Sequence, residues 1–127
     1  GFTSGKLNLP PGIGRSGEAA AREYVTTELG YKVVETNFRT AGEIDIVAKS
    51  DSDFVFIEVK TRTNQIFGLG VEQISTSKAQ RLQTTDLRYL EKTGDFDVDW
   101  RIDLLRIQMS NSGQVLRFDY IQNAIEE

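Results

Sequence analysis

Hydrophobic and polar positions along the chain follow two periods, and these divide it into helices and strands. Residues 16–30 and 75–94 carry apolar side chains at helical spacing, behind a Ser or Thr cap and before a glycine, which predicts two helices. Runs rich in β-branched and aromatic residues predict five strands. These strands span residues 31–38, 43–49, 54–61, 98–108 and 114–120.

The resulting order, α-β-β-β-α-β-β, predicts one α/β domain in which helices flank a mixed central sheet. A chain of 127 residues can bury one core of this kind but not two. Residues 1–14 hold four glycines and both prolines, so we interpret them as a flexible amino-terminal arm. The folded domain is then expected over residues 15–127.

Two of the predicted strands contain charges within otherwise apolar sequence, namely Gly42–Val47 and Phe54–Lys60. A turn over residues 50–53 would place Asp45 opposite Glu58 and Glu43 opposite Lys60, with each pair on one face. Strict alternation would also place Ile44 on the same face as Ile46 and Ala48. Burying such charges is unfavourable unless they are paired, and two adjacent carboxylates repel unless a cation lies between them.

This arrangement predicts a metal site in which Asp45 and Glu58 are ligands, assisted by the carbonyl of Val59. Lys60 would orient or help deprotonate an attacking water, or stabilise charge on the phosphorane. Glu18, at the start of the first helix, could supply a further carboxylate. Such a site is typical of metal-assisted phosphodiester hydrolysis. The alternative is structural, because Glu and Lys on one sheet face often form only a cross-strand ion pair.

The chain contains neither cysteine nor histidine, which excludes disulfides, zinc sites built on these residues, and Ser-His or Cys-His triads. Oxygen ligands remain, and they favour Mg²⁺ or Mn²⁺. The formal net charge of −4 argues against a nucleic-acid partner, although the local field at a contact surface matters more than the average. No apolar stretch is long enough to span a bilayer and no secretory signal is present, so we expect a cytoplasmic protein without a membrane partner.

Several of these residues recur together in a known family, in the same order and spacing. They are Gly17-Glu18, Gly42-Glu43-Ile44-Asp45, Glu58-Val59-Lys60-Thr61-Arg62, Lys78 and Arg101-Ile102-Asp103. Over roughly residues 13–125 the chain resembles the YraN-like bacterial family. That family is similar to the PD-(D/E)xK nuclease superfamily, which includes archaeal Holliday-junction resolvases and restriction endonucleases.

The resemblance implies a restriction-endonuclease-like αβββαβ core and a Mg²⁺- or Mn²⁺-dependent endonuclease acting on DNA, including branched or structured DNA. It matches Asp45, Glu58 and Lys60 to the catalytic acids and lysine, and Glu18 to a helix-borne glutamate. Ile44 stands where the superfamily has proline. The resolvases act as dimers, but no residue of this chain by itself indicates a homodimer.

Candidate substrate-binding residues are Arg62, Gln73 and Lys78. Gln73 lies 13 residues after Lys60, where some related nucleases carry a glutamine near the site. For each residue a surface or loop role is the alternative. At the level of the whole protein, the alternative to an enzyme is a non-catalytic nucleic-acid-binding or protein-interaction module that retains the nuclease fold.

Overall fold

A computed structural model describes residues 2–3, 17–40, 42–63, 76–95 and 97–124 of the chain. The two helices are α1 (Gly17–Thr27) and α2 (Thr76–Thr93). The strands are β1 (Phe2–Thr3), β2 (Lys32–Arg39), β3 (Glu43–Ser50), β4 (Asp53–Thr63), β5 (Trp100–Met109) and β6 (Val115–Ile121). Apart from the two-residue β1, this is the predicted order of elements.

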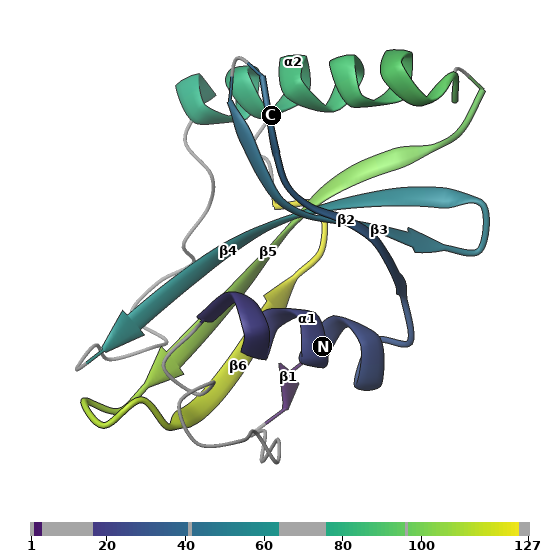
Figure 1. Cartoon of the computed structure of the whole chain (residues 1–127). Coiled ribbons are helices and arrows are strands. Elements are labelled where there is room, and N and C mark those ends of the chain that lie inside the picture. Colours follow the sequence, from purple (N-terminus) through teal and green to yellow (C-terminus); the bar gives the residue numbers. More distant parts are fainter. Residues whose placement is uncertain (1, 4–16, 41, 64–75, 96, 125–127) are drawn as a thin grey trace.

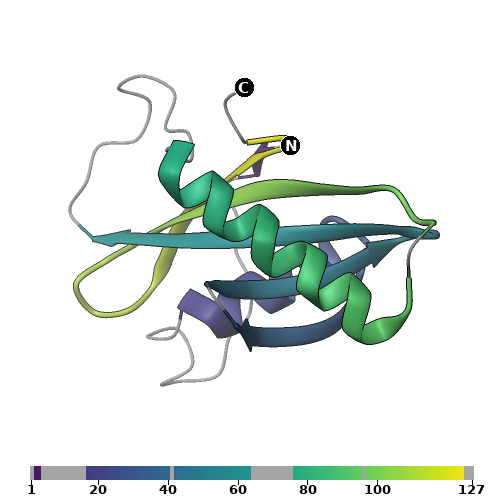
Figure 2. The same cartoon turned by 90° about the horizontal axis from the view of Figure 1, so that it is seen from above.

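One sheet forms the middle of the molecule, in the strand order β1-β6-β5-β4-β3-β2. Among the described strands only β4 and β5 run parallel, and α2 lies in the crossover between them. Helix α1 covers one face of the sheet and α2 crosses the other, as Figures 1 and 2 show. The structure therefore confirms a single α/β domain with a mixed sheet, consistent with a restriction-endonuclease-like αβββαβ core.

Successive side chains of β4 point to opposite faces of the sheet, and the apolar ones pack against α2 on one face and α1 on the other. Phe54 and Phe56 face α2, where they pack with Leu82 and Tyr89. Val55 and Ile57 face α1 and pack with its buried side chains. A central strand with two apolar faces needs a helix on each side, which explains why the two helices flank the sheet.

The hairpin of β2 and β3 departs from this regular alternation near Asp45. Asn37 has a positive φ of 55° and lies between the pairs Thr36–Ile46 and Phe38–Ile44, opposite Asp45. Ile44 consequently joins the core under α2, whereas Ile46 and Ala48 face α1. The prediction that Ile44 shares their face was wrong, because a left-handed residue breaks the period of two.

The predicted register of β3 and β4 is confirmed where the two strands pair, from Lys49–Phe54 to Ile46–Ile57. Pairing ends there, so Glu43 has no ladder partner in β4 and Lys60 is not opposite it. Glu43 is paired instead with Arg39 of β2, whose Nε lies 2.9 Å from its carboxylate. The two strands separate at the height of Asp45 and Glu58.

Most of the predicted amino-terminal arm, together with Ser16, Gln73 and Ser75, lies outside the described residues. Phe2 and Thr3 pair with Asp119 and Phe118 of β6. Among the described residues, no helix combines the length and hydropathy needed to cross a membrane.

A buried hydroxyl on α2 fixes the end of the β2–β3 hairpin. The Oγ1 of Thr85 accepts a hydrogen bond from the backbone N–H of Gly42 at 2.9 Å and donates one to the carbonyl of Arg81 at 2.8 Å. A Cβ at position 42 would lie 3.0 Å from that hydroxyl oxygen. This close approach requires a small residue at position 42, and it holds β3 against α2.

We expect Thr85→Val to destabilise the protein by about 1–3 kcal/mol, because the buried N–H of Gly42 would lose its acceptor. Thr84→Val is the matched control. Thr84 also donates to the carbonyl four residues earlier, at 3.0 Å, but is exposed, so its loss should stay within about 0.5 kcal/mol. Urea unfolding of both variants measures the difference, and equal losses would contradict the role given to Thr85.

Candidate functional site

A small pocket opens where β3 separates from β4, beneath the first turns of α2. It is lined by Gly42, Glu43 and Asp45 from the β2–β3 hairpin and β3, by Glu58 from β4, and by Lys78, Arg81 and Leu82 from α2. Its cavity volume is about 160 Å³. That is room for a hydrated ion or a phosphate group, and less than the roughly 300–1,000 Å³ typical of sites for larger organic ligands.

Asp45 is held at the point of strand separation by a backbone hydrogen bond. The N–H of Val59 donates to Asp45 Oδ2 at 2.8 Å, so this carboxylate satisfies an N–H group that no longer has a β3 backbone partner. The pKa of Asp45 is raised to about 6, chiefly by burial and secondarily by the charges of Glu58 and Glu43, against the opposing effects of the Val59 N–H and Lys78. The other carboxylate oxygen of Asp45 accepts no hydrogen bond from the described residues.

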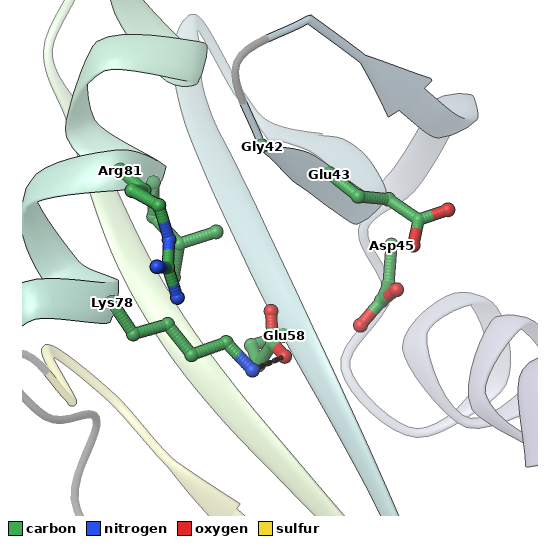
Figure 3. Close-up of a pocket in the computed structure, with 7 residues that line it drawn as sticks. Gly42, Glu43, Asp45, Glu58, Lys78 and Arg81 are labelled. Atoms are coloured by element: carbon green, nitrogen blue, oxygen red, sulfur yellow. Dashed lines mark ion pairs between the residues drawn. The ribbon is translucent and has the colours of Figure 1, made fainter.

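Glu58 is almost buried, with 8% of its surface exposed. Its cation comes from α2: the Nζ of Lys78 lies 2.5 Å from Glu58 Oε1. Figure 3 shows Lys78 and Arg81 directed from α2 toward Glu58, while Asp45 points into the same space from β3 and Glu43 points away. An ion pair therefore exists at this site, but it joins Glu58 on a strand to Lys78 on a helix, rather than Glu43 to Lys60 across two strands.

The structure brings together only some of the residues that the sequence indicated. Lys60 lies on the same face of β4 as Glu58, two residues further along, but it does not line the pocket. Glu18 is exposed at the start of α1, where its Oε2 accepts a weak hydrogen bond from Asn37 Nδ2 at 3.4 Å. Arg62 lies still further along β4. The roles predicted for all three remain predictions.

Arg101 and Asp103 belong to a different part of the molecule. Asp103 is fully buried and accepts hydrogen bonds from Arg101, from the hydroxyl of Tyr120 and from the backbone N–H of Asn123. Arg101 also donates to the hydroxyl of Tyr31 at 2.8 Å. This network joins β5, the end of β6 and the segment after α1, so its role in the fold is structural.

Asp86 on α2 is a buried acid that the sequence analysis missed. It is fully buried, and neither carboxylate oxygen has a hydrogen-bond partner in the described part of the chain. Burial, and secondarily the charge of Glu58, raise its pKa to about 8. Its position four residues after Leu82 and three before Tyr89, on the buried stripe of α2, is the signal that could have revealed it.

The carboxylates of Asp45 and Glu58 are side-chain oxygens that could hold a metal ion at the pocket, and the assistance of the Val59 carbonyl remains a prediction. Within the residues described, no group of three or more acidic side chains is arranged as a metal site. Two carboxylates nevertheless suit Mg²⁺, which usually keeps several waters and takes only one or two carboxylates together with substrate phosphates. Burial and, secondarily, the charge of Glu58 raise the pKa of Asp45, and a bound cation would offset both effects.

Together, the fold and this pocket define a single-domain α/β protein with a nuclease-like core and a carboxylate pair at the point where two of its strands separate. Residues 17–122 match the model of the uncharacterised protein family UPF0102, which covers both helices and the strands from β2 to β6. The chain belongs to this family.

Relatives in the same family align along nearly their whole length. A UPF0102 protein of Alkaliphilus metalliredigens is 35% identical over 113 residues, which cover 88% of this chain and 96% of the relative. A UPF0102 protein of Dictyoglomus turgidum is also 35% identical, covering 88% and 95%. A UPF0102 protein of Geobacter metallireducens is 36% identical over 115 residues, covering 90% and 92%.

The pKa of Asp86 predicts how stability depends on pH. A folded-state pKa of about 8, against the 3.8 usual for an aspartate, means that the folded protein favours protonated Asp86. The contribution of Asp86 to the free energy of unfolding is then greatest below about pH 4. It falls as pH rises toward 8, by up to about 1.4 kcal/mol per pH unit. Asp86→Asn should remove this decline.

Urea unfolding of the wild type and Asp86→Asn, between about pH 5 and pH 8, measures the effect. The advantage of the variant should grow with pH. Asp97→Asn, at an exposed position, controls for the loss of one negative charge and should follow the wild type. Parallel curves for all three proteins would contradict the assignment of a neutral Asp86 in the folded state.

Proposed function

We propose that this protein is a metal-dependent phosphodiester hydrolase that acts as an endonuclease on DNA, branched or structured DNA included. The observation that carries the proposal is the convergence of Asp45 and Glu58 on one small pocket, beside two cations of α2. The nuclease-like order of elements agrees with it. We further propose Mg²⁺ or Mn²⁺ as the cofactor, held by the carboxylates of Asp45 and Glu58.

Four residues of the pocket have a part in this chemistry. When bound, the divalent ion would neutralise the phosphate and lower the pKa of an attacking water. Asp45 and Glu58 fix the position of that ion, and the bond from Val59 orients Asp45. Lys78 and Arg81, directed into the pocket from α2 (Figure 3), would contact the phosphate oxygens. The attacking water gives up a proton to solvent and its oxygen bonds to phosphorus, the bond to the leaving sugar oxygen breaks, and that oxygen takes up a proton from solvent.

Asp45→Asn should lower metal-dependent cleavage of DNA by roughly 100-fold or more, because the remaining carboxylate would hold the cation poorly. Asparagine is preferred to alanine here because its side-chain oxygen can still accept the hydrogen bond from Val59. Cleavage of linear, flapped and four-way DNA is measured with Mg²⁺ and with Mn²⁺, and unfolding in urea verifies that the variant is folded.

Glu43→Gln is the matched control for the loss of an acid at this pocket. Glu43 lines the pocket but is ion-paired with Arg39 and points away from Glu58, so the control should cleave like the wild type. If the wild type cuts none of the three DNA substrates with either metal, the proposed activity is wrong. Binding of DNA that persists in chelator, without cleavage, would instead favour the non-catalytic module.

Lys78 should compete with the metal ion for Glu58, since the two cations would share one nearly buried carboxylate. Lys78→Met keeps the length of the side chain and removes its charge, so we expect it to tighten Mn²⁺ binding by about 3- to 10-fold. Isothermal titration of Mn²⁺ into DNA-free protein gives the affinity without relying on cleavage.

Arg81→Met is the matched control for Lys78→Met, because Arg81 lines the same pocket from the same helix without an ion pair to Glu58 among the contacts described. It should change the affinity for Mn²⁺ less than Lys78→Met does. Equal tightening of Mn²⁺ binding in both variants would mean that the loss of any nearby positive charge explains the effect, not competition for Glu58. Weaker Mn²⁺ binding in Lys78→Met would show that Lys78 does not compete with the ion.

A further inference from the structure

Strand β2 contains a residue with a left-handed backbone conformation, beside the pocket. Asn37 has a φ of 55° and is the one residue of the described strands with a positive φ, since Asp51 and Asn123 lie outside strands. This region is disfavoured for residues that carry a Cβ, and asparagine is among the few that tolerate it. Asn37 is exposed, so burial of its side chain in the core does not explain the conformation.

Both strands of the β2–β3 hairpin change faces at this position. Ile46 packs in the core under α1, whereas Phe38 and Ile44, which pair with each other, belong to the core under α2. Residues two apart in a regular strand share a face, so the hairpin turns over between Ile46 and Ile44. Asn37 and Asp45 lie opposite each other at this point. Beyond it, the hairpin rises out of the sheet toward α2 (Figure 1).

The raised end of the hairpin forms one wall of the pocket. It is held against α2 by the hydrogen bond from the Gly42 N–H to Thr85 Oγ1 at 2.9 Å, and Gly42 and Glu43 both line the pocket. Regular pairing of β3 with β4 would instead continue past the last ladder pair and close the gap between the strands. The space for a ligand therefore depends on the change of face at Asn37.

The side chain of Asn37 makes a weaker contribution than its backbone. Its Nδ2 donates to Glu18 Oε2 at 3.4 Å, which is a long hydrogen bond between two exposed side chains. Such a bond in contact with water stabilises little. The effect of Asn37 on the hairpin is therefore assigned to its backbone conformation.

We propose that Asn37 is a positioning residue of the candidate site: its left-handed backbone turns the hairpin over and so opens the pocket between Asp45 and Glu58. The inference deepens the proposed function, and rests on it where metal binding is concerned. A divalent ion that keeps several of its waters needs this space as well as the two carboxylates. Asn37 does not line the pocket, so it acts through the hairpin rather than on the ligand.

Two substitutions separate the backbone of Asn37 from its side chain. Asn37→Gly removes the side chain and keeps access to a positive φ, whereas Asn37→Val places a β-branched residue where one is strongly disfavoured. Asn123→Val is the matched control, because Asn123 is also an exposed asparagine, with a φ of 50°, and lies after β6. Urea unfolding verifies that each variant is folded. Asn37→Ala, which disfavours a positive φ less strongly, replaces Asn37→Val if that variant does not fold.

Hydrogen exchange of the Gly42 amide, measured without metal, reports whether the hairpin end stays against α2, since this N–H is bonded to Thr85. Exchange in Asn37→Val should be at least about tenfold faster than in Asn123→Val, and Asn37→Gly should stay within about threefold of the wild type. Exchange in Asn37→Val as slow as in Asn123→Val would overturn the inference. Exchange in Asn37→Gly as fast as in Asn37→Val would also overturn it, because the side chain would then be responsible.

Isothermal titration of Mn²⁺ into DNA-free protein tests the consequence for the site. Asn37→Val should bind Mn²⁺ at least about tenfold more weakly than Asn123→Val, and Asn37→Gly should stay within about threefold of the wild type. Faster exchange at Gly42 with unchanged Mn²⁺ affinity would refute the positioning role and leave the proposed function intact. A wild type that binds no Mn²⁺ would refute the proposed cofactor, and the exchange of Gly42 alone then decides whether Asn37 opens the pocket.

Discussion

The hydrogen bond from the Val59 N–H to the Asp45 carboxylate is the interaction on which the candidate site depends. Pairing between β3 and β4 stops at Ile46 and Ile57, and the backbone of β4 beyond that point needs other acceptors. A side-chain carboxylate supplies one at 2.8 Å. The strands can therefore separate without leaving a buried N–H group unsatisfied, and the space between them becomes the pocket.

The same separation concentrates charge. Asp45, Glu58 and Asp86 are all wholly or partly buried, and Glu58 raises the pKa values of the other two carboxyl groups. Lys78 neutralises Glu58 at 2.5 Å, and Asp86, with its pKa raised to about 8, is largely protonated at neutral pH. Asp45 is then the buried acid without an ion pair in the described part of the chain. An unbalanced buried charge of this kind is costly to the fold. Sites that tolerate it are often functional, because perturbed carboxyl groups cluster where a protein binds ions or performs chemistry.

Local sequence predicted most of the architecture. The helix from Gly17, the register of the β3–β4 hairpin and the two-faced burial of β4 all follow from side-chain period and turn residues. The prediction failed at Ile44, because a left-handed Asn37 on the neighbouring strand cannot be recognised from the sequence of β3. It also failed to pair Glu58 with Lys78, since 20 residues separate them and only the crossover helix brings them together.

The sequence by itself determined which side chains are available as ligands: oxygen donors, without histidine or cysteine. It also determined that Glu58 lies at the polar end of an apolar strand. Tertiary structure decided which charges meet. Helix α2 places Lys78 and Arg81 over the pocket and buries Asp86. The physical reason is that charges interact through space, and distances across a sheet or beneath a helix depend on packing between segments remote in sequence.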